Sequence, residues 1–149
     1  MTRSNAREIV AQLAYEMYFC GEDALQILEK HMQPEHFASL QGESEAYAER
    51  PSAKQMEYIR TTLCGLQEHR EELDGYIKKY AIGWDISRIA KTARAIMQLA
   101  MYECLYAPDV PTSSAINEAV ELTRKYADEE TVAFVNGILG SFAREVAEQ

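Results

Sequence analysis

Apolar residues recur at helical spacing along almost the whole chain. The first segment carries them on one face of a helix, at Ala6, Val10, Leu13 and Met17. A second, shorter helix is expected between Asp23, which can cap it, and Pro34. Residues 35–51 lose this spacing and contain Gly42 and several serines and glutamates. We therefore expect mostly loop there, in the most mobile part of the chain.

The clearest pattern lies in residues 52–80. Ser52 and Gln55 have the spacing of a capping box, in which each side chain bonds the other residue's backbone N–H. The apolar stripe that follows contains Met56, Ile59, Leu63, Leu66, Leu73, Ile77 and Tyr80, and only Arg70 interrupts it. This pattern predicts one helix of about seven turns. We expect its stripe in a bundle core rather than a dimeric coiled coil, because the other helices offer matching stripes.

The second half of the chain predicts four further helices. A short one covers residues 86–90, longer ones cover about 92–106 and 113–126, and the last carries Val132 to Val146. The helix at 92–106 has the widest apolar face and should be the central, most buried one. The acidic residues 128–130 suit a helix N-terminus, where the helix dipole favours negative charge.

No segment shows sustained alternation of apolar and polar residues, so a sheet is not expected. The pattern predicts an all-α protein of about seven helices in two small antiparallel bundles. We expect an N-terminal helical half at residues 1–83 and a C-terminal helical half at 84–149, within a single domain of residues 1–149.

The amino-acid composition restricts the possible functions more than the possible folds. The 149 residues include 15 Lys and Arg against 24 Asp and Glu, for a formal charge of -9. That charge argues against tight binding of nucleic acid by this chain alone, because phosphates attract a basic surface. Only in residues 1–20 do the acidic and basic side chains balance.

Three cysteines, Cys20, Cys64 and Cys104, lie far apart and form no CxxC pair. We expect reduced, buried thiols in a cytoplasmic protein rather than a zinc ribbon or a disulfide framework. No targeting segment is recognisable. The most apolar stretch, residues 93–107, contains charged side chains and predicts no membrane span.

No catalytic signature is present, because the sequence has no HExxH, GxSxG, P-loop or GxGxxG motif. His31 and His36 could hold a metal ion, but Pro34 between them favours a solvated loop. Cys64 and His69 could be a nucleophile and a base, but Cys64 lies beside the apolar stripe, which favours a core thiol. We therefore expect no enzyme, no cofactor and no metal site, and a function in binding.

Specific motifs occupy the C-terminal half. They are Arg94-Ala95-Ile96 with Leu99-Ala100-Met101-Tyr102-Glu103, Asp109-Val110-Pro111 with Ala115-Ile116-Asn117-Glu118-Ala119-Val120-Glu121-Leu122, and Phe134-Val135-Asn136-Gly137-Ile138-Leu139. The first helix adds Ala6-Arg7-Glu8, Gln12 and Tyr15. Together these residues resemble the NusB family of bacterial transcription antitermination factors. Residues 22–83 share only helical character with it.

The resemblance implies an all-α fold of two small bundles without catalytic activity. It also implies binding of the boxA segment of nascent ribosomal RNA transcripts together with NusE, a small-subunit ribosomal protein. The resulting assembly makes RNA polymerase resistant to termination. Some members of the family form homodimers that hide the RNA-binding surface, so the resemblance leaves a monomer and a homodimer open.

Candidate RNA contacts follow from the same resemblance. Arg3 and Arg7 of the first helix are the expected RNA-binding cations, with Arg124 and Lys125 as further contributors. Phe134 either stacks on an RNA base or belongs to the core.

Other positions have expected roles in protein contacts or packing. Tyr15 and Tyr18 are the expected contacts to a protein partner, because each combines an apolar ring with a polar tip. Asn117 and Asn136 are expected as buried hydrogen-bonding groups. Gly137, unusual inside a helix, is expected to let another helix approach closely.

The sequence departs from the family in its cations. The family's first helix usually begins with an arginine-rich run, of which Arg3 and Arg7 remain, and the loop after Pro111 lacks a common basic residue. The chain alone should bind RNA weakly, and a basic partner could supply the positive charge that attracts the phosphates. Two alternatives stay open: a protein–protein adaptor with little RNA binding, and an RNA-binding module related to ribosomal RNA methyltransferases. The 149 residues leave no room for a methyltransferase domain.

Overall fold

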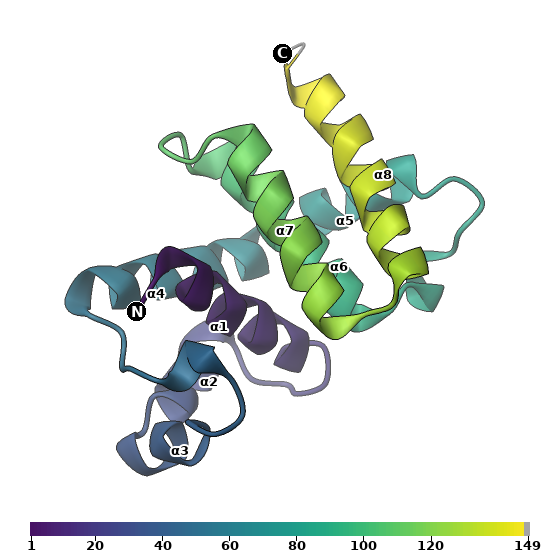
Figure 1. Cartoon of the computed structure of the whole chain (residues 1–149). Coiled ribbons are helices and arrows are strands. Elements are labelled where there is room, and N and C mark those ends of the chain that lie inside the picture. Colours follow the sequence, from purple (N-terminus) through teal and green to yellow (C-terminus); the bar gives the residue numbers. More distant parts are fainter. Residues whose placement is uncertain (148–149) are drawn as a thin grey trace. The chain divides into compact units, whose positions relative to one another are not determined.

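The computed structural model describes residues 1–147, which form eight α-helices and two short 3-10 helices without a strand (Figure 1). The expected all-α class is confirmed, and the count of about seven helices is close. Within the same residues, no helix is both long and apolar enough to cross a membrane. The chain divides into two compact units, Met1–Glu68 and His69–Gln149. This division falls earlier than the boundary expected after residue 83.

Unit 1 contains four α-helices and one 3-10 helix: α1 (Arg3–Glu16), α2 (Ala24–His31), α3 (Pro34–Ser39), η1 (Glu45–Tyr47) and α4 (Ala53–Glu68). Helices α1 and α2 both pack on α4, and η1 packs on α1. Fully buried side chains of α1 and α4 form the core, among them Ile9, Leu13, Ile59 and Leu63. The expected helix start at Asp23 is present, because its carboxylate accepts from the Gln26 N–H at 2.9 Å.

The segment expected to be mostly loop, residues 35–51, contains two short helical elements separated by turns and irregular backbone. It contains most of α3 and the whole of η1, and the rings of Phe37 and Tyr47 are buried. The burial of these aromatic side chains was not expected, because they enter the core without helical periodicity, which is the signal that the sequence pattern measures. The expectation of a solvated His31 was also wrong, since His31 is the last residue of α2 and is buried beside Tyr47.

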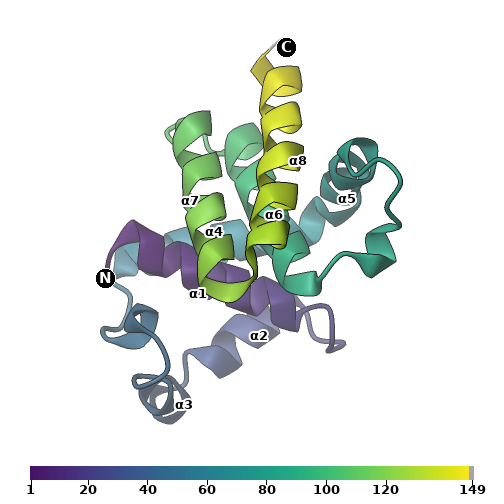
Figure 2. The same ribbon diagram turned by 45° about the vertical axis from the view of Figure 1, so that its right-hand side comes forward.

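Unit 2 is built around one helix. Its elements are α5 (Arg70–Tyr80), η2 (Ile86–Arg88), α6 (Lys91–Tyr106), α7 (Thr112–Tyr126) and α8 (Glu129–Ala147). Helix α6 contacts α5, α7 and α8, and ten of its sixteen residues are buried. Figure 1 and Figure 2 show α6, α7 and α8 side by side. The wide apolar face of this segment correctly predicted the central helix.

The single helix expected at residues 52–80 is two helices. A turn at His69 separates α4 from α5, and the His69 carbonyl accepts the first hydrogen bond of α5, from the Leu73 N–H at 3.0 Å. The His69 ring stacks on Tyr106, with ring centroids 4.2 Å apart. The apolar stripe packs into the core of unit 1 along α4 and into the core of unit 2 along α5. Periodicity missed the break because the turn barely changes the phase of the stripe.

Candidate functional site

A groove in unit 2 brings together aromatic and charged side chains from η2, α6 and α8. Trp84, just before η2, and Phe134 on α8 have ring centroids 5.5 Å apart, and their planes are inclined at 58°. Arg88 and Glu130 lie at the same groove, which has a volume of about 530 Å³. We call it the Trp84–Phe134 groove. The Phe134 ring is half-buried against Trp84, so its outer part can reach a ligand.

The chain turn after α5 presents Trp84. Gly83 has φ +83°, a left-handed conformation that favours glycine, and the Trp84 N–H donates to the Ala81 carbonyl at 3.0 Å. The Trp84 side chain is 54% exposed, and neighbouring Ile82 is also exposed. The sequence pattern assigned Trp84 no role in a binding site. The missed signal was a large aromatic residue directly after a glycine, where no helical stripe could bury it.

The charges at the groove have different structural roles. Asp128 caps α8, because its Oδ1 accepts from the Thr131 N–H at 2.8 Å. Hydrogen bonds from the Thr131 side chain and backbone lower the pKa of Asp128. Glu130 stands in the first turn of α8 and lines the groove. Arg88 is exposed and forms no salt bridge with any residue in the described part of the chain. The groove therefore offers aromatic faces, one cation and one carboxylate.

The expected N-terminal cations differ in how far they can reach solvent. Arg3, in the first turn of α1, is exposed, and its guanidinium lies 3.9 Å from the centre of the Tyr58 ring. Arg7 is only 9% exposed. Both belong to unit 1, and Arg3 presents most of the reachable positive charge of the pair.

Arg124 and Lys125 lie in the last turn of α7, in unit 2, and both are exposed. Arg124 forms a salt bridge with Glu121, one helical turn earlier. The ammonium of Lys125 lies 5.7 Å from the centre of the Tyr126 ring. The charge of Arg124 is thus partly balanced within its own helix.

The expected partner-binding tyrosines stand at the end of α1. Tyr15 is 39% exposed, and Tyr18 is half-buried. Tyr15 makes an edge-to-face contact with Phe19, with ring centroids 5.0 Å apart. Phe19 is 64% exposed and was missed from the sequence. An exposed aromatic pair of this kind suits contact with a protein surface.

Three packing expectations are wrong. The side chains of Asn117 and Asn136 are exposed, not buried. Gly137 is also exposed, and a methyl group in place of its hydrogen would meet no other atom within 4 Å, so no helix approaches it closely. Cys20 is likewise exposed rather than buried. Asn117 and Asn136 therefore belong to the surface of unit 2.

These features define a helical binding protein with an exposed aromatic groove and separate exposed cations. The chain belongs to the NusB family of transcription antitermination proteins, whose sequence pattern matches residues 4–144. It is 38% identical over 148 residues to a transcription antitermination protein NusB from Carboxydothermus hydrogenoformans, covering 99% of this chain and 96% of that protein.

Solved structures share the fold. A NusB structure from T. maritima matches with a TM-score of 0.80 at 28% identity and covers 100% of this chain and 99% of that one. A crystal structure of the antitermination factors NusB and NusE in complex with dsRNA matches with a TM-score of 0.74, covering 96% of each chain. At 23% identity, this second likeness concerns the fold alone.

Proposed function

We propose that this chain binds boxA-type RNA together with the ribosomal protein NusE, as part of the antitermination complex on RNA polymerase. The observation that carries the proposal is the Trp84–Phe134 groove with Arg88 beside it. Proteins read single-stranded RNA mainly by stacking its bases on aromatic rings, with cations nearby for the phosphates. A related fold occurs in a structure of NusB and NusE in complex with dsRNA.

Cations outside the groove supply further phosphate contacts in this proposal. Arg3 contributes more than Arg7 because it is more exposed, and Arg124 and Lys125 contribute from the end of α7. With a net charge of -9, the chain needs a basic partner to bind RNA tightly. This requirement gives NusE a physical role in RNA affinity. Tyr15 and Tyr18 at the end of α1 form part of its contact surface.

The proposed role is binding without catalysis or a cofactor, in the cytoplasm. A protein–protein adaptor with little RNA binding is the second candidate. It is favoured by the burial of Arg7 and by the salt bridge of Arg124 with Glu121, which leave few cations for phosphate.

One titration tests both candidates. Labelled boxA-like RNA is titrated with the chain, with and without NusE, and the Phe134→Ala variant is compared with Leu25→Ala, which removes an exposed side chain of unit 1. We expect tight binding only with NusE, and weakening by Phe134→Ala alone. NusE binding without any gain in RNA affinity would support the adaptor. Tyr15→Asp should abolish capture of NusE while the helical circular dichroism spectrum persists.

A further inference from the structure

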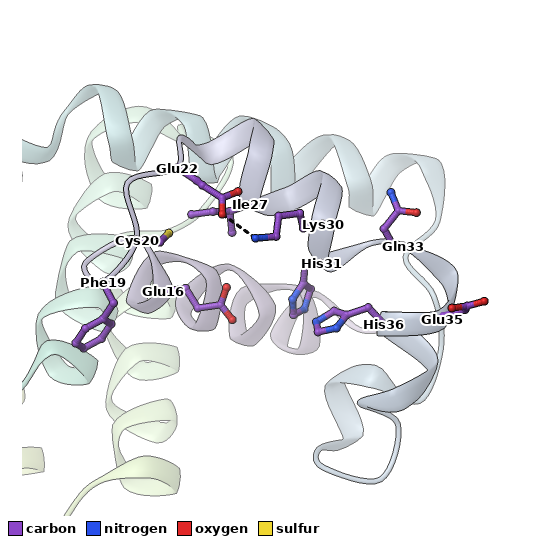
Figure 3. A pocket seen from close by; sticks show the side chains of 10 residues that line it. All are labelled: Glu16, Phe19, Cys20, Glu22, Ile27, Lys30, His31, Gln33, Glu35 and His36. Atoms are coloured by element: carbon purple, nitrogen blue, oxygen red, sulfur yellow. Dashed lines mark hydrogen bonds and ion pairs between the residues drawn. The ribbon is translucent and has the colours of Figure 1, made fainter.

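A second pocket lies in unit 1, where α1, α2 and α3 meet, and has a volume of about 730 Å³ (Figure 3). His31 and His36 form one wall, with their rings edge to face and centroids 5.4 Å apart. Figure 3 shows Glu16 extending from α1 toward these imidazoles. Phe19 and Ile27 add apolar surface. None of these side chains belongs to the Trp84–Phe134 groove.

His31 presents an unprotonated nitrogen. The side chain is 5% exposed, and its Nε2 lies 3.1 Å from the Tyr47 hydroxyl oxygen. The Tyr47 hydroxyl donates to Gln12 Oε1, which leaves the tyrosine oxygen to accept from His31, and we therefore assign the tautomer with the proton on Nε2. Burial, assisted by nearby His36, lowers the pKa of His31 to about 4. The ring is therefore neutral near pH 7, with a lone pair on Nδ1.

The second imidazole nitrogen, Nδ1, has no hydrogen-bond partner among residues 1–147. His31 has no hydrogen bond other than that with Tyr47. Among residues 1–147, no side-chain nitrogen or oxygen is fully buried without a hydrogen-bond partner. Nδ1 is therefore not fully enclosed, and His31 is one of the residues that line the pocket. The pocket thus contains a preformed acceptor on a side chain that is otherwise enclosed.

The charge around the pocket is negative. Besides the two histidines, the ionisable lining residues Glu16, Glu22 and Glu35 are acidic, and Lys30 is basic. The ammonium of Lys30 is occupied by Glu22 at 2.7 Å. Glu16 has no hydrogen bond or salt bridge from its carboxylate to any described residue. The groups that face the pocket are therefore mainly acceptors in a negative field, which repels phosphate and attracts a cation.

The spacing of these acceptors selects the kind of cation. In residues 1–147, no three His, Cys, Asp or Glu side chains lie close enough to hold a metal ion. A guanidinium reaches acceptors that are further apart, because it carries five N–H donors in a planar fork. Its flat face also stacks on aromatic rings, such as that of His36, and the arginine methylenes fit apolar walls.

We propose that this pocket receives an arginine side chain from a basic protein partner. The guanidinium donates to the Glu16 carboxylate and to His31 Nδ1, and the methylenes pack on Phe19 and Ile27. The site is separate from the RNA groove and does not depend on RNA binding.

The test uses a neutral, capped glycine pentapeptide with one central arginine, and a matched peptide with lysine in its place. The full chain, labelled for NMR, is titrated with each peptide without RNA or NusE. We expect the arginine peptide to shift the Ile27 methyl and both imidazole signals, and to bind more tightly than the lysine peptide. Glu16→Gln should weaken it about tenfold, as expected for the loss of a charge-assisted hydrogen bond.

Glu43→Gln is the matched control, because it removes the same charge from an exposed position of unit 1 outside the pocket. It should change the affinity less than about twofold. The proposal is overturned if no signals of the pocket shift, if lysine binds as well as arginine, or if both glutamine variants weaken binding equally. The last result would show attraction by net charge only. The peptide titration contains no RNA, so its result does not depend on whether the chain binds boxA-like RNA.

Discussion

Arg94 and Asp74 join α6 to α5 through two parallel hydrogen bonds. Arg94 Nε donates to Asp74 Oδ1 at 3.0 Å, and Nη2 donates to Oδ2 at 2.6 Å. Gln98, one turn further along α6, donates to the same Oδ1 at 2.6 Å. Both charged side chains are partly buried, so water competes weakly for these bonds. This bidentate pair explains why an arginine begins the first NusB-like motif, inside a central helix.

Asp74→Ala should therefore destabilise unit 2. It removes the Asp74 carboxylate as an acceptor for the Arg94 guanidinium and the Gln98 amide, and we expect a loss of about 2–3 kcal/mol in the free energy of unfolding. Urea denaturation measures it. Glu71→Ala removes an exposed carboxylate from the same helix and should stay within about 0.5 kcal/mol of the parent. Equal effects of the two substitutions would show that the Asp74 pair adds nothing.

Trp84 is the only tryptophan, so its fluorescence reports on the Trp84–Phe134 groove. We expect boxA-like RNA at low salt to change its emission, because a stacked base alters the surroundings of the indole. Phe134→Ala should weaken the RNA titration by about 1–3 kcal/mol, the range for losing one base-stacking ring. Phe19→Leu removes an exposed ring from unit 1 and should have no effect. An emission unchanged at saturating RNA would place the RNA elsewhere.

The helices could be predicted from the sequence where burial follows helical periodicity. The central helix α6 was found because its apolar face is wide, and the start of α2 because Asp23 caps it. The turn at His69 could not be found, because the stripe continues across it almost in phase. Residues 34–47 were missed because Phe37 and Tyr47 enter the core from short elements without a periodic stripe.

The candidate site was only partly predictable. Phe134 came from a resemblance, but its neighbour Trp84 lies fifty positions earlier in a loop, and only the fold brings the two rings together. Exposure was hardest to predict. Arg7 and Arg3 are equivalent cations in the sequence, yet one is mostly buried and the other exposed. Side-chain type does not reveal which face of a helix another element covers.

Arg3 and Arg7 should consequently behave differently. Arg3→Ala should lower the slope of log affinity against log salt by about 1 for RNA bound with NusE, because one phosphate contact is lost. Arg7→Ala should change that slope less and lower the unfolding free energy more, since Arg7 is mostly buried. Fluorescence anisotropy at several salt concentrations and urea denaturation separate the two. A slope unchanged by both variants would remove the start of α1 from the RNA surface.

His31 should make the protein sensitive to acid. Its pKa is lowered to about 4 by burial and then by His36, whereas an unfolded histidine titrates near 6.5. As the pH falls, the unfolded chain binds the proton first, so stability decreases between about pH 6.5 and 4. The contribution is about 2 kcal/mol at pH 4.5 relative to pH 7.

Urea denaturation across this pH range checks the effect of His31. His31→Gln should flatten the curve, because glutamine does not titrate and retains polar groups for Tyr47. His36→Gln, at an exposed position, should keep most of the pH dependence. If the parent and His31→Gln gave parallel curves of unfolding free energy against pH, His31 would be protonated equally in the folded and unfolded states.

Glu130 is the acidic side chain that lines the groove, and its charge repels RNA phosphates. Asp128 is committed to capping α8, whereas the Glu130 carboxylate lies beside Phe134 and faces any phosphate bound there. Glu130→Gln keeps the shape and removes the charge. Two charges about 7 Å apart in water interact by roughly 0.6 kcal/mol, so RNA affinity with NusE should rise about threefold, and less at high salt. Glu129→Gln is the matched control, because Glu129 occupies the same helical turn but does not line the groove. It should change the affinity little, and both variants should retain the NusE affinity of the parent. If both variants strengthen RNA binding equally, only net charge matters and the Trp84–Phe134 groove is not where the RNA lies.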